Sequence, residues 1–194
     1  MSVSEDAQLI AQIKEGDLKA FEALYHKYKG PVFRTALAIT RDRGAAEEIL
    51  QDCFLRAYMH IHKVDGSSPL PPWLHRIAVN LSYNWAAKQR LRLIPLEGVL
   101  DGLIASSLTS PEGGAERAEL QQMVQEAIHA LEFKQRTVLI LFYLQGFSLA
   151  EIAYILDCPI GTVKSRLHYG RENLRRKLQG DKRLPREGLA YEFT

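Results

Sequence analysis

The stretch FSLAEIAYILDCPIGTVKSRLHYGRENLRRKL, residues Phe147–Leu178, holds two amphipathic segments separated by a short break. Ser148 and Glu151 have the spacing of a capping box, and apolar residues then recur every three or four positions, so we expect a helix up to the break. Asp157-Cys158-Pro159 ends that helix, because proline cannot continue it. We expect a second helix to begin two or three residues after this proline.

The second of these segments is strongly basic. From Gly161 to Arg183 the chain carries eight lysines and arginines against two acidic residues, a net charge of +6. The apolar residues expected to face inward are Val163, Leu167, Leu174 and Leu178, and those expected to face outward include Lys164, Ser165, His168, Glu172 and Arg175. A capped helix, a tight turn and a basic amphipathic helix predict a helix-turn-helix, whose second helix enters the major groove of DNA. An ordinary helical hairpin with a charged surface is the alternative.

A second informative stretch is WLHRIAVNLSYNWAAKQR, residues Trp73–Arg90. One face repeats every four residues and is expected to be core; it consists of Trp73, Ile77, Leu81 and Trp85. The other face combines cationic, amide and aromatic side chains, namely Arg76, Asn80, Tyr83, Asn84 and Lys88. Such groups contact phosphates and base edges and stack on unpaired bases, so this face could hold single-stranded DNA.

The rest of the chain indicates an all-α protein of two small helical domains. Helical spacing of apolar residues runs through the first 92 residues, and strand signals are nearly absent. Glycine, serine and proline interrupt that spacing between Pro95 and Glu116, where a flexible linker is expected. The linker is acidic, whereas the segments on either side of it are basic.

Composition excludes several classes of protein. The start of the chain lacks the features of a signal peptide and no apolar run approaches 18 residues, so we expect a cytoplasmic protein without membrane insertion. Two distant cysteines fit a reducing compartment. Cys53 is expected on an apolar face and no fourth ligand accompanies His60 and His62, so no metal is expected. Without a phosphate loop or a nucleophile motif, we expect neither a cofactor nor an enzyme.

The two informative stretches and one acidic helix together resemble the extracytoplasmic-function (ECF) sigma factors of the sigma-70 superfamily. AAEEILQDCFLRAY (Ala45–Tyr58) is similar to the family's core-binding helix. PWLHRIAVN, from Pro72 to Asn80, is similar to the start of its promoter-melting helix, and PIGTVKSRLHYGRENLRRKL (Pro159–Leu178) to its recognition helix. The likeness extends from about Asp17 to Leu178.

The resemblance implies a division of labour along the chain. Residues 1–92 would form region 2, which docks on the beta-prime coiled coil of core RNA polymerase and opens the -10 element of promoter DNA. Residues 93–115 would be the linker. Residues 116–180 would form region 4, which reads the -35 element as duplex and touches the beta flap, followed by a tail at 181–194. A regulatory anti-sigma factor is expected by the same analogy.

Site residues carry over by position from the same resemblance. The residues expected to face the polymerase are Glu48, Gln51, Asp52 and Arg56. Those expected at the melted -10 strand are Asn80, Tyr83, Asn84, Lys88 and Arg90, with Tyr83 as the stacking platform. Those expected at the -35 element are Lys164, Ser165, His168 and Tyr169, with Arg166 and Arg171 nearer the phosphates. Asn84, where aspartate is common, and Tyr169, where arginine is frequent, make the promoter sequence unpredictable by analogy.

The linker must span the distance between the two DNA sites when both domains are bound to a promoter. As a coil, the 23 residues from Arg92 to Gly114 span roughly 26 Å. Two duplex sites one and a half turns apart are about 50 Å from each other. The linker is therefore expected to be stretched when both domains bind.

Two other functions fit part of the sequence. A conventional helix-turn-helix repressor or activator accounts for the C-terminal stretch but needs neither the acidic helix nor the aromatic basic one. An inactive sigma-like adaptor that binds only proteins needs no basic recognition helix.

Overall fold

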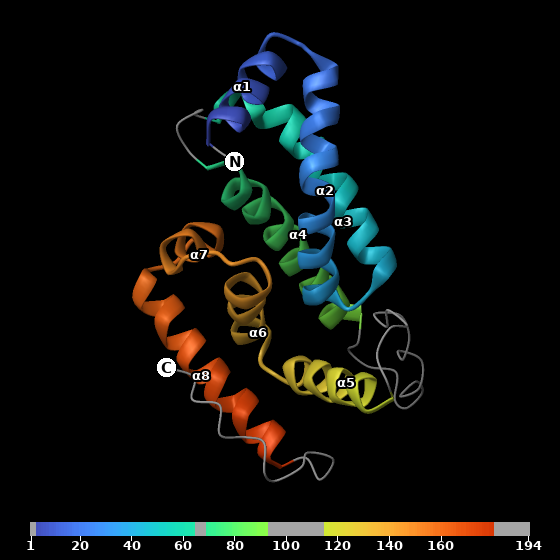
Figure 1. Ribbon diagram of the computed structural model, residues 1–194, viewed down its shortest axis with the longest axis vertical. Coiled ribbons are helices and arrows are strands. Elements are labelled where there is room, and N and C mark those ends of the chain that lie inside the picture. The colour runs from blue at the N-terminus through green and yellow to red at the C-terminus, as the bar shows by residue number, and fades with distance from the viewer. Residues whose placement is uncertain (1–2, 65–68, 93–114, 181–194) are drawn as a thin grey trace.

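The protein is built from helices (Figure 1), and its computed structural model describes residues 3–64, 69–92 and 115–180. The N-terminal half contains α1 (Val3–Lys14), α2 (Leu18–Thr40), α3 (Arg43–His60), a 3-10 turn η1 (Ile61–Lys63) and α4 (Leu70–Arg92). The C-terminal half contains α5 (Ala115–His129), α6 (Phe133–Leu139), a π-helical turn η2 (Ile140–Leu144), α7 (Leu149–Leu156) and α8 (Ile160–Gln179). No strand occurs in these ranges, so the predicted all-α class is confirmed.

Aspartate side chains begin α2 and α3. The Asp17 carboxylate accepts hydrogen bonds from the backbone N–H groups of Lys19 and Ala20, and the Asp42 carboxylate accepts one from Ala45. Arg41 lies between these helices with a φ of 65°, in the left-handed region that commonly ends a helix. These caps allow α2 to reverse into α3 within a short turn.

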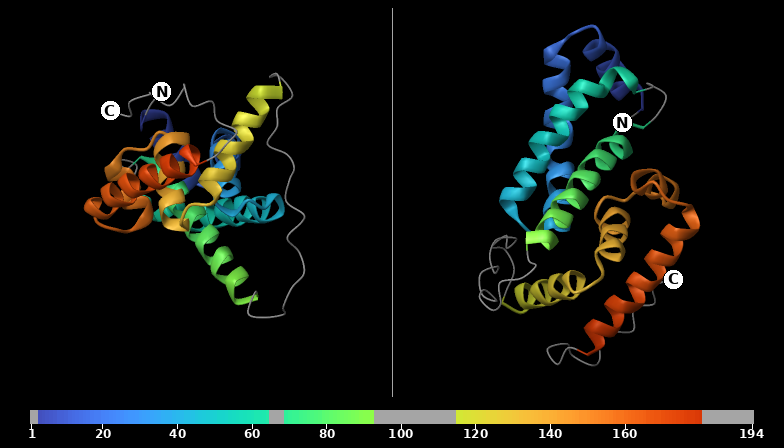
Figure 2. Two further views of the ribbon diagram at one scale, coloured as in Figure 1. Left: turned by 90° about the horizontal axis from the view of Figure 1, so that it is seen from below. Right: turned by 180° about the vertical axis from the view of Figure 1, so that it is seen from behind.

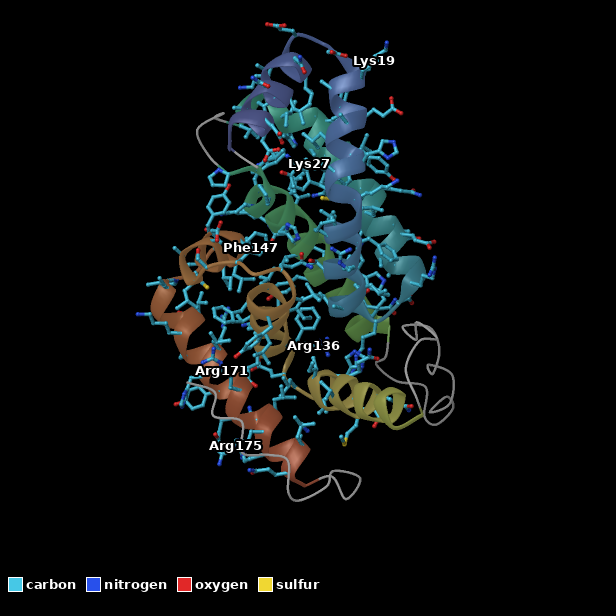
Figure 3. All side chains as sticks on the ribbon, viewed as in Figure 1. Lys19, Lys27, Arg136, Phe147, Arg171 and Arg175 are labelled. Atoms are coloured by element: carbon cyan, nitrogen blue, oxygen red, sulfur yellow. The ribbon has the colours of Figure 1, made fainter. Side chains whose placement is uncertain are left out.

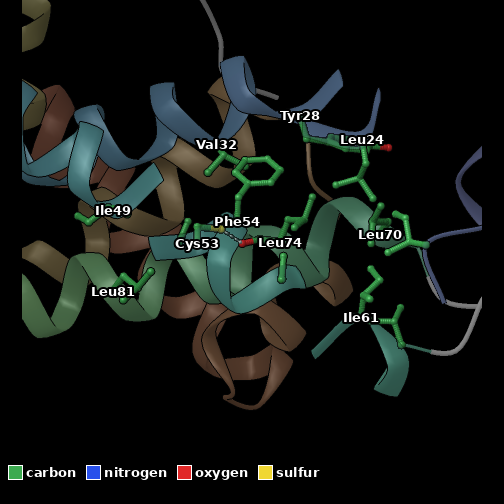
Figure 4. Packing of buried hydrophobic residues seen from close by; sticks show 14 of the residues in the cluster. Leu24, Tyr28, Val32, Ile49, Cys53, Phe54, Ile61, Leu70, Leu74 and Leu81 are labelled. Carbon is green, nitrogen blue, oxygen red and sulfur yellow. Dashed lines mark hydrogen bonds between the residues drawn. The ribbon is translucent and has the colours of Figure 1, made fainter. Parts of the chain in front are cut away.

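The N-terminal core forms where α2, α3 and α4 meet and α1 covers one end (Figure 4). Leu24, Val32 and Leu74 are fully buried there, and Cys53 donates a 3.5 Å hydrogen bond to the Leu74 carbonyl oxygen. The predicted stripe on α4 faces this core: Leu81 is buried, and Trp73, Ile77 and Trp85 pack against it half-buried. The prediction of that face as core is confirmed.

The helix-turn-helix is formed by α7 and α8. The Ser148 hydroxyl accepts a hydrogen bond from the Glu151 N–H, and the Glu151 carboxylate accepts one from the Ser148 N–H, so the predicted capping box is confirmed. Asp157 ends α7 with a φ of 50°. The recognition helix α8 begins at Ile160, slightly earlier than predicted, because Pro159 itself precedes its first turn.

A second core lies between α6, η2, α7 and α8, so the prediction of two helical domains is confirmed. Ile152, Ile155 and Val163 are fully buried in it. The same cluster contains Ile39 of α2 and Val79 of α4, so the two domains are packed against each other, with α6 and α7 alongside α4 (Figures 1 and 2). The predicted linker from 93 to 114 and the tail from 181 lie outside the described residues.

Candidate nucleic-acid interface

The exposed face of α8 carries most of the residues predicted to read duplex DNA. Lys164, Ser165, His168 and Tyr169 are all exposed, and the imidazole of His168 meets the Tyr169 ring edge-on with centroids 5.3 Å apart. The Ser165 hydroxyl donates a 3.1 Å hydrogen bond to the Thr162 carbonyl oxygen. These side chains project from the first half of the helix, which is the part that enters the groove in helix-turn-helix proteins.

The two arginines expected near phosphates are half-buried. Arg166 donates a 3.8 Å hydrogen bond to the Cys158 sulfur, in the turn before α8. The Arg171 guanidinium lies 5.5 Å from the ring centroids of both Phe142 and Tyr143 on η2. Figure 3 labels Arg171 on α8. The cation–π contacts of Arg171 hold α8 against η2. Both arginines remain partly exposed, although the Nε atom of Arg171 is buried.

The face of α4 predicted to hold single-stranded DNA is partly exposed and partly covered by the C-terminal domain. Asn80, Asn84 and Lys88 are exposed. Arg90 lies in the last turn of α4, and its side chain is outside the described part of the chain. Tyr83, in contrast, is half-buried and meets Phe133 of the C-terminal domain edge-on at 4.9 Å between centroids. The Tyr83 hydroxyl is buried next to Thr137, and burial raises its pKa.

Arg76, on the same face, also makes contacts that the sequence did not predict. Its Nη1 atom donates a 2.9 Å hydrogen bond to the Tyr154 carbonyl oxygen, and its Nη2 atom is 3.2 Å from the Asp157 carboxylate. The guanidinium also lies over the Tyr154 ring, 5.1 Å from the centroid. Arg76 therefore joins α4 to α7 and to the turn of the helix-turn-helix.

His75, next to Arg76, is buried in the same region. It is 2% exposed, its Nδ1–H donates to the Pro71 carbonyl oxygen at 2.8 Å, and its ring meets Phe147 edge-on at 4.8 Å. Burial lowers the pKa of the imidazole, which favours the neutral form. His75 acts here as an apolar ring with one satisfied donor.

The residues predicted to face the polymerase share the outer surface of α3. Glu48, Gln51, Asp52 and Arg56 are all exposed. Leu55, Tyr58 and Met59 are exposed among them, at 59%, 45% and 52%. Leu55 follows Gln51 by four residues and Asp52 by three, and Tyr58 and Met59 follow Leu55 by three and four. This spacing could have identified them from the sequence, because it places them on the same side of the helix. Charged and apolar groups thus form one surface, which is typical of a protein interface.

The structure was also searched for metal-binding clusters and membrane-spanning helices. Over the described ranges, no group of three or more histidine, cysteine or acidic side chains is arranged to hold a metal ion. In the same part of the chain, no helix is both long enough and apolar enough to span a bilayer.

Comparison with known proteins identifies the family. The model of sigma-70 region 2 matches residues 24–92, and that of sigma-70 region 4 matches residues 121–174. The chain is 35% identical over 177 residues to the ECF RNA polymerase sigma factor SigW of Bacillus subtilis, covering 88% of this chain and 95% of the relative. The chain belongs to the ECF sigma factors of the sigma-70 family. The predicted family is thereby confirmed.

Other sigma factors are also similar to this chain in sequence or in structure. The ECF RNA polymerase sigma-E factor of Haemophilus influenzae is 34% identical over 184 residues, covering 90% of this chain and 95% of the relative. The sigma factor RpoE of Bartonella quintana, solved in complex with the anti-sigma factor NepR, matches with a TM-score of 0.65 at 25% identity, covering 85% of this chain and all of that one. In this sigma factor, the region 2 match ends with α4, and the region 4 match contains α7 and most of α8.

Proposed function

We propose that this ECF sigma factor is a dissociable promoter-recognition subunit of RNA polymerase that reads the -35 duplex with α8 and opens the -10 element with α4. The observation that carries this proposal is the exposed, basic first half of α8 directly after a capped α7 and a tight turn. Region 2 would be residues 1–92 and region 4 residues 116–180. The linker would be residues 93–115 and the tail residues 181–194.

Lys164 and Ser165 are proposed to contact base edges of the -35 element, with His168 and Tyr169 one turn further along. Arg166 and Arg171 would contact phosphates with the exposed parts of their guanidinium groups. The ring contacts of Arg171 support this role, because a cation fixed against η2 loses less conformational freedom on binding.

The α4 face is proposed to hold the melted -10 strand. Asn80, Asn84, Lys88 and Arg90 would bind the strand, and Tyr83 would stack on an unpaired base. Asn80 and Asn84 are exposed amides one helical turn apart, an arrangement able to bind base edges or sugar.

The outer surface of α3 is proposed to bind the beta-prime coiled coil. Glu48, Gln51, Asp52 and Arg56 would supply polar contacts around Leu55 and its apolar neighbours. The C-terminal domain would contact the beta flap. Because the Bartonella relative was solved with an anti-sigma factor, we propose a similar protein partner for this chain. The proposed role is cytoplasmic and requires no cofactor, since RNA synthesis is catalysed by the polymerase.

Run-off transcription over a fragmented genomic library tests the function. Purified core polymerase with this protein should produce new transcripts downstream of a shared two-part motif. Asp52→Lys should abolish co-purification with core, whereas Glu15→Lys, the same charge change on an exposed residue after α1, should not. Absence of new transcripts together with duplex binding by the protein alone would instead indicate a conventional repressor or activator.

A further inference from the structure

Tyr169 places a large aromatic ring on the side of α8 that faces away from the protein. The helix packs on α6 and α7 by one side, and these elements leave its opposite side uncovered (Figures 1 and 2). Tyr169 is 59% exposed there, among polar and charged side chains that include Ser165 and Glu172. A helix that only gripped phosphates would carry cations at such a position, so the ring indicates a different kind of contact.

The ring of Tyr169 is held in one orientation before any DNA binds. The His168 imidazole meets it edge-on, with centroids 5.3 Å apart and ring planes at 70°. Edge-on contacts of this kind are a preferred arrangement of two aromatic groups. A side chain that is already restrained loses less conformational freedom on binding, so Tyr169 presents a pre-organised apolar surface.

Tyr169 lies one helical turn after Ser165, on the same side of α8. Four residues correspond to about 6 Å along the helix axis. Base pairs in duplex DNA are stacked about 3.4 Å apart, so the ring faces a base pair within about two steps of the one that Ser165 reaches. The Ser165 hydroxyl already donates to the Thr162 carbonyl oxygen, which leaves it only acceptor lone pairs for DNA. The two side chains therefore offer different chemistry to neighbouring base pairs.

The major groove offers one apolar group that matches an aromatic ring. Its floor consists of hydrogen-bond donors and acceptors, apart from the C5-methyl group of thymine. The phosphates on either side are charged, and Arg166 and Arg171 are better suited to them. The Tyr169 hydroxyl could also reach a base edge, but the ring carries most of the exposed surface of this side chain.

We propose that Tyr169 selects a thymine in the -35 element by packing its ring on the C5-methyl group of that base. This inference rests on the proposed function of α8. It assigns the contact to the aromatic ring and not to the hydroxyl. One base pair of the -35 element is then recognised by an apolar contact, whereas Lys164 and Ser165 recognise others by hydrogen bonds.

Replacement of thymine by deoxyuridine tests this contact, because deoxyuridine lacks only the methyl group. Binding of the full chain with core polymerase is measured on promoter DNA in which each thymine of the -35 element, on either strand, is replaced in turn. Binding should fall about fourfold at one position, roughly the factor that burial of one methyl-sized group contributes. Equal binding at every thymine and its deoxyuridine replacement would overturn the proposal.

Variants of Tyr169 show whether its ring senses the methyl group. Tyr169→Ala should bind the thymine promoter more weakly and should no longer distinguish thymine from deoxyuridine. Tyr169→Phe keeps the ring and should keep the fourfold preference. The matched control is Tyr143→Ala on η2, since Tyr143 is also exposed, at 51%, and it should keep the preference as well. A preference that persists in Tyr169→Ala, or one that Tyr169→Phe loses, would overturn the assignment to the ring.

5-Methylcytosine carries the same methyl group on a different base. At the sensitive position, a pair of guanine with 5-methylcytosine should bind better than a pair of guanine with cytosine. Tyr169→Ala should bind these two pairs equally. Tighter binding of the methylated cytosine pair than of the thymine pair would overturn thymine as the selected base.

The outcomes separate this inference from the proposed function. If core polymerase with this protein binds promoters equally with and without a -35 element, both the proposed function of α8 and the thymine contact are overturned. Binding that depends on the -35 element but not on any thymine methyl group would overturn the thymine contact alone. Because Tyr169 is exposed and outside both cores, its variants should fold.

Discussion

Arg136 of α6 donates a hydrogen bond to the carbonyl oxygen of Ile39, 97 residues earlier in the chain. The same guanidinium also binds the His129 carbonyl oxygen, at the end of α5, and the side chain is only 8% exposed. Burial lowers its pKa. The pKa of Arg41 is lowered to about 10, mainly by burial and to a smaller extent by the nearby charge of Arg136. The domain contact thus combines specific hydrogen bonds with repulsion between two arginines.

Removing this guanidinium should destabilise the protein. Arg136→Met keeps much of the apolar length of the side chain but leaves two carbonyl oxygens without their charged donor. Because hydrogen bonds to charged groups contribute roughly 1.5 to 3 kcal/mol each, we expect a loss of about 2 to 3 kcal/mol in the free energy of unfolding, after relief of the repulsion with Arg41. Urea unfolding of the full chain measures this loss.

Lys134→Met is the matched control on the same helix, because Lys134 is exposed. It should change the free energy of unfolding by less than about 0.5 kcal/mol. Equal effects of the two substitutions would show that Arg136 contributes no more to the free energy of unfolding than an exposed lysine does.

Protonation of His75 should weaken the fold in mildly acidic solution. The folded protein lowers the pKa of this imidazole by burial, whereas in the unfolded chain the pKa is about 6.5. The unfolded state therefore binds the proton more readily, and stability falls as the pH drops below about 6.5. His75→Phe keeps the ring against Phe147 and removes the titration.

Unfolding free energies at a pH of about 7.5 and about 5.5 measure this effect, since these values lie on either side of the imidazole pKa. The wild-type chain should lose more stability over this interval than His75→Phe. Identical losses would mean that His75 binds its proton in the folded state as easily as in the unfolded one.

Local features of this sigma factor were predictable from sequence because local physics determines them. The Ser148–Glu151 capping box and the break at Pro159 depend only on neighbouring residues. Helical spacing likewise identified the exposed face of α8 and the buried stripe of α4. The π-helical turn at η2 has no such local signature, and it was not predicted.

Contacts between the domains could not be predicted in the same way. Helical periodicity indicates which face of a helix is apolar, but it does not indicate which distant segment covers that face. Val79 and Ile39 look like ordinary core residues of the N-terminal domain, yet they pack in the C-terminal core. Arg76 and Tyr83 look like a DNA-binding face, and the same cationic and aromatic character lets them dock on Tyr154 and Phe133.

The ring of Tyr83, rather than its hydroxyl, should matter for promoter opening. Tyr83→Ala removes the stacking surface, which contributes about 1 to 3 kcal/mol per base, so opening should fall roughly 5- to 150-fold. Tyr83→Phe should open promoters normally, because the hydroxyl is buried without a geometrically sound hydrogen bond among the described residues. Permanganate footprinting of the melted region compares the variants.

Core polymerase binding by Tyr83→Ala serves as the internal control, since α3 carries the proposed polymerase surface. A large loss of opening in Tyr83→Phe would show instead that the hydroxyl contacts the DNA strand once the domains separate.

Lys164, in the first turns of α8, should determine sequence preference at the -35 element. It is exposed beside Ser165, and its ammonium group is a donor suited to guanine O6 and N7 in the major groove. Lys164→Ala should weaken transcription from the preferred -35 sequence by about 1 to 3 kcal/mol and weaken it much less from a sequence altered at the contacted base pair. Lys177→Ala is the control, because Lys177 lies in the last turn of the same helix, away from the residues proposed to contact bases. Any phosphate contact that it makes would lower binding to both sequences alike. A uniform loss for Lys164→Ala would likewise make Lys164 a phosphate contact and leave base recognition to Ser165, His168 and Tyr169.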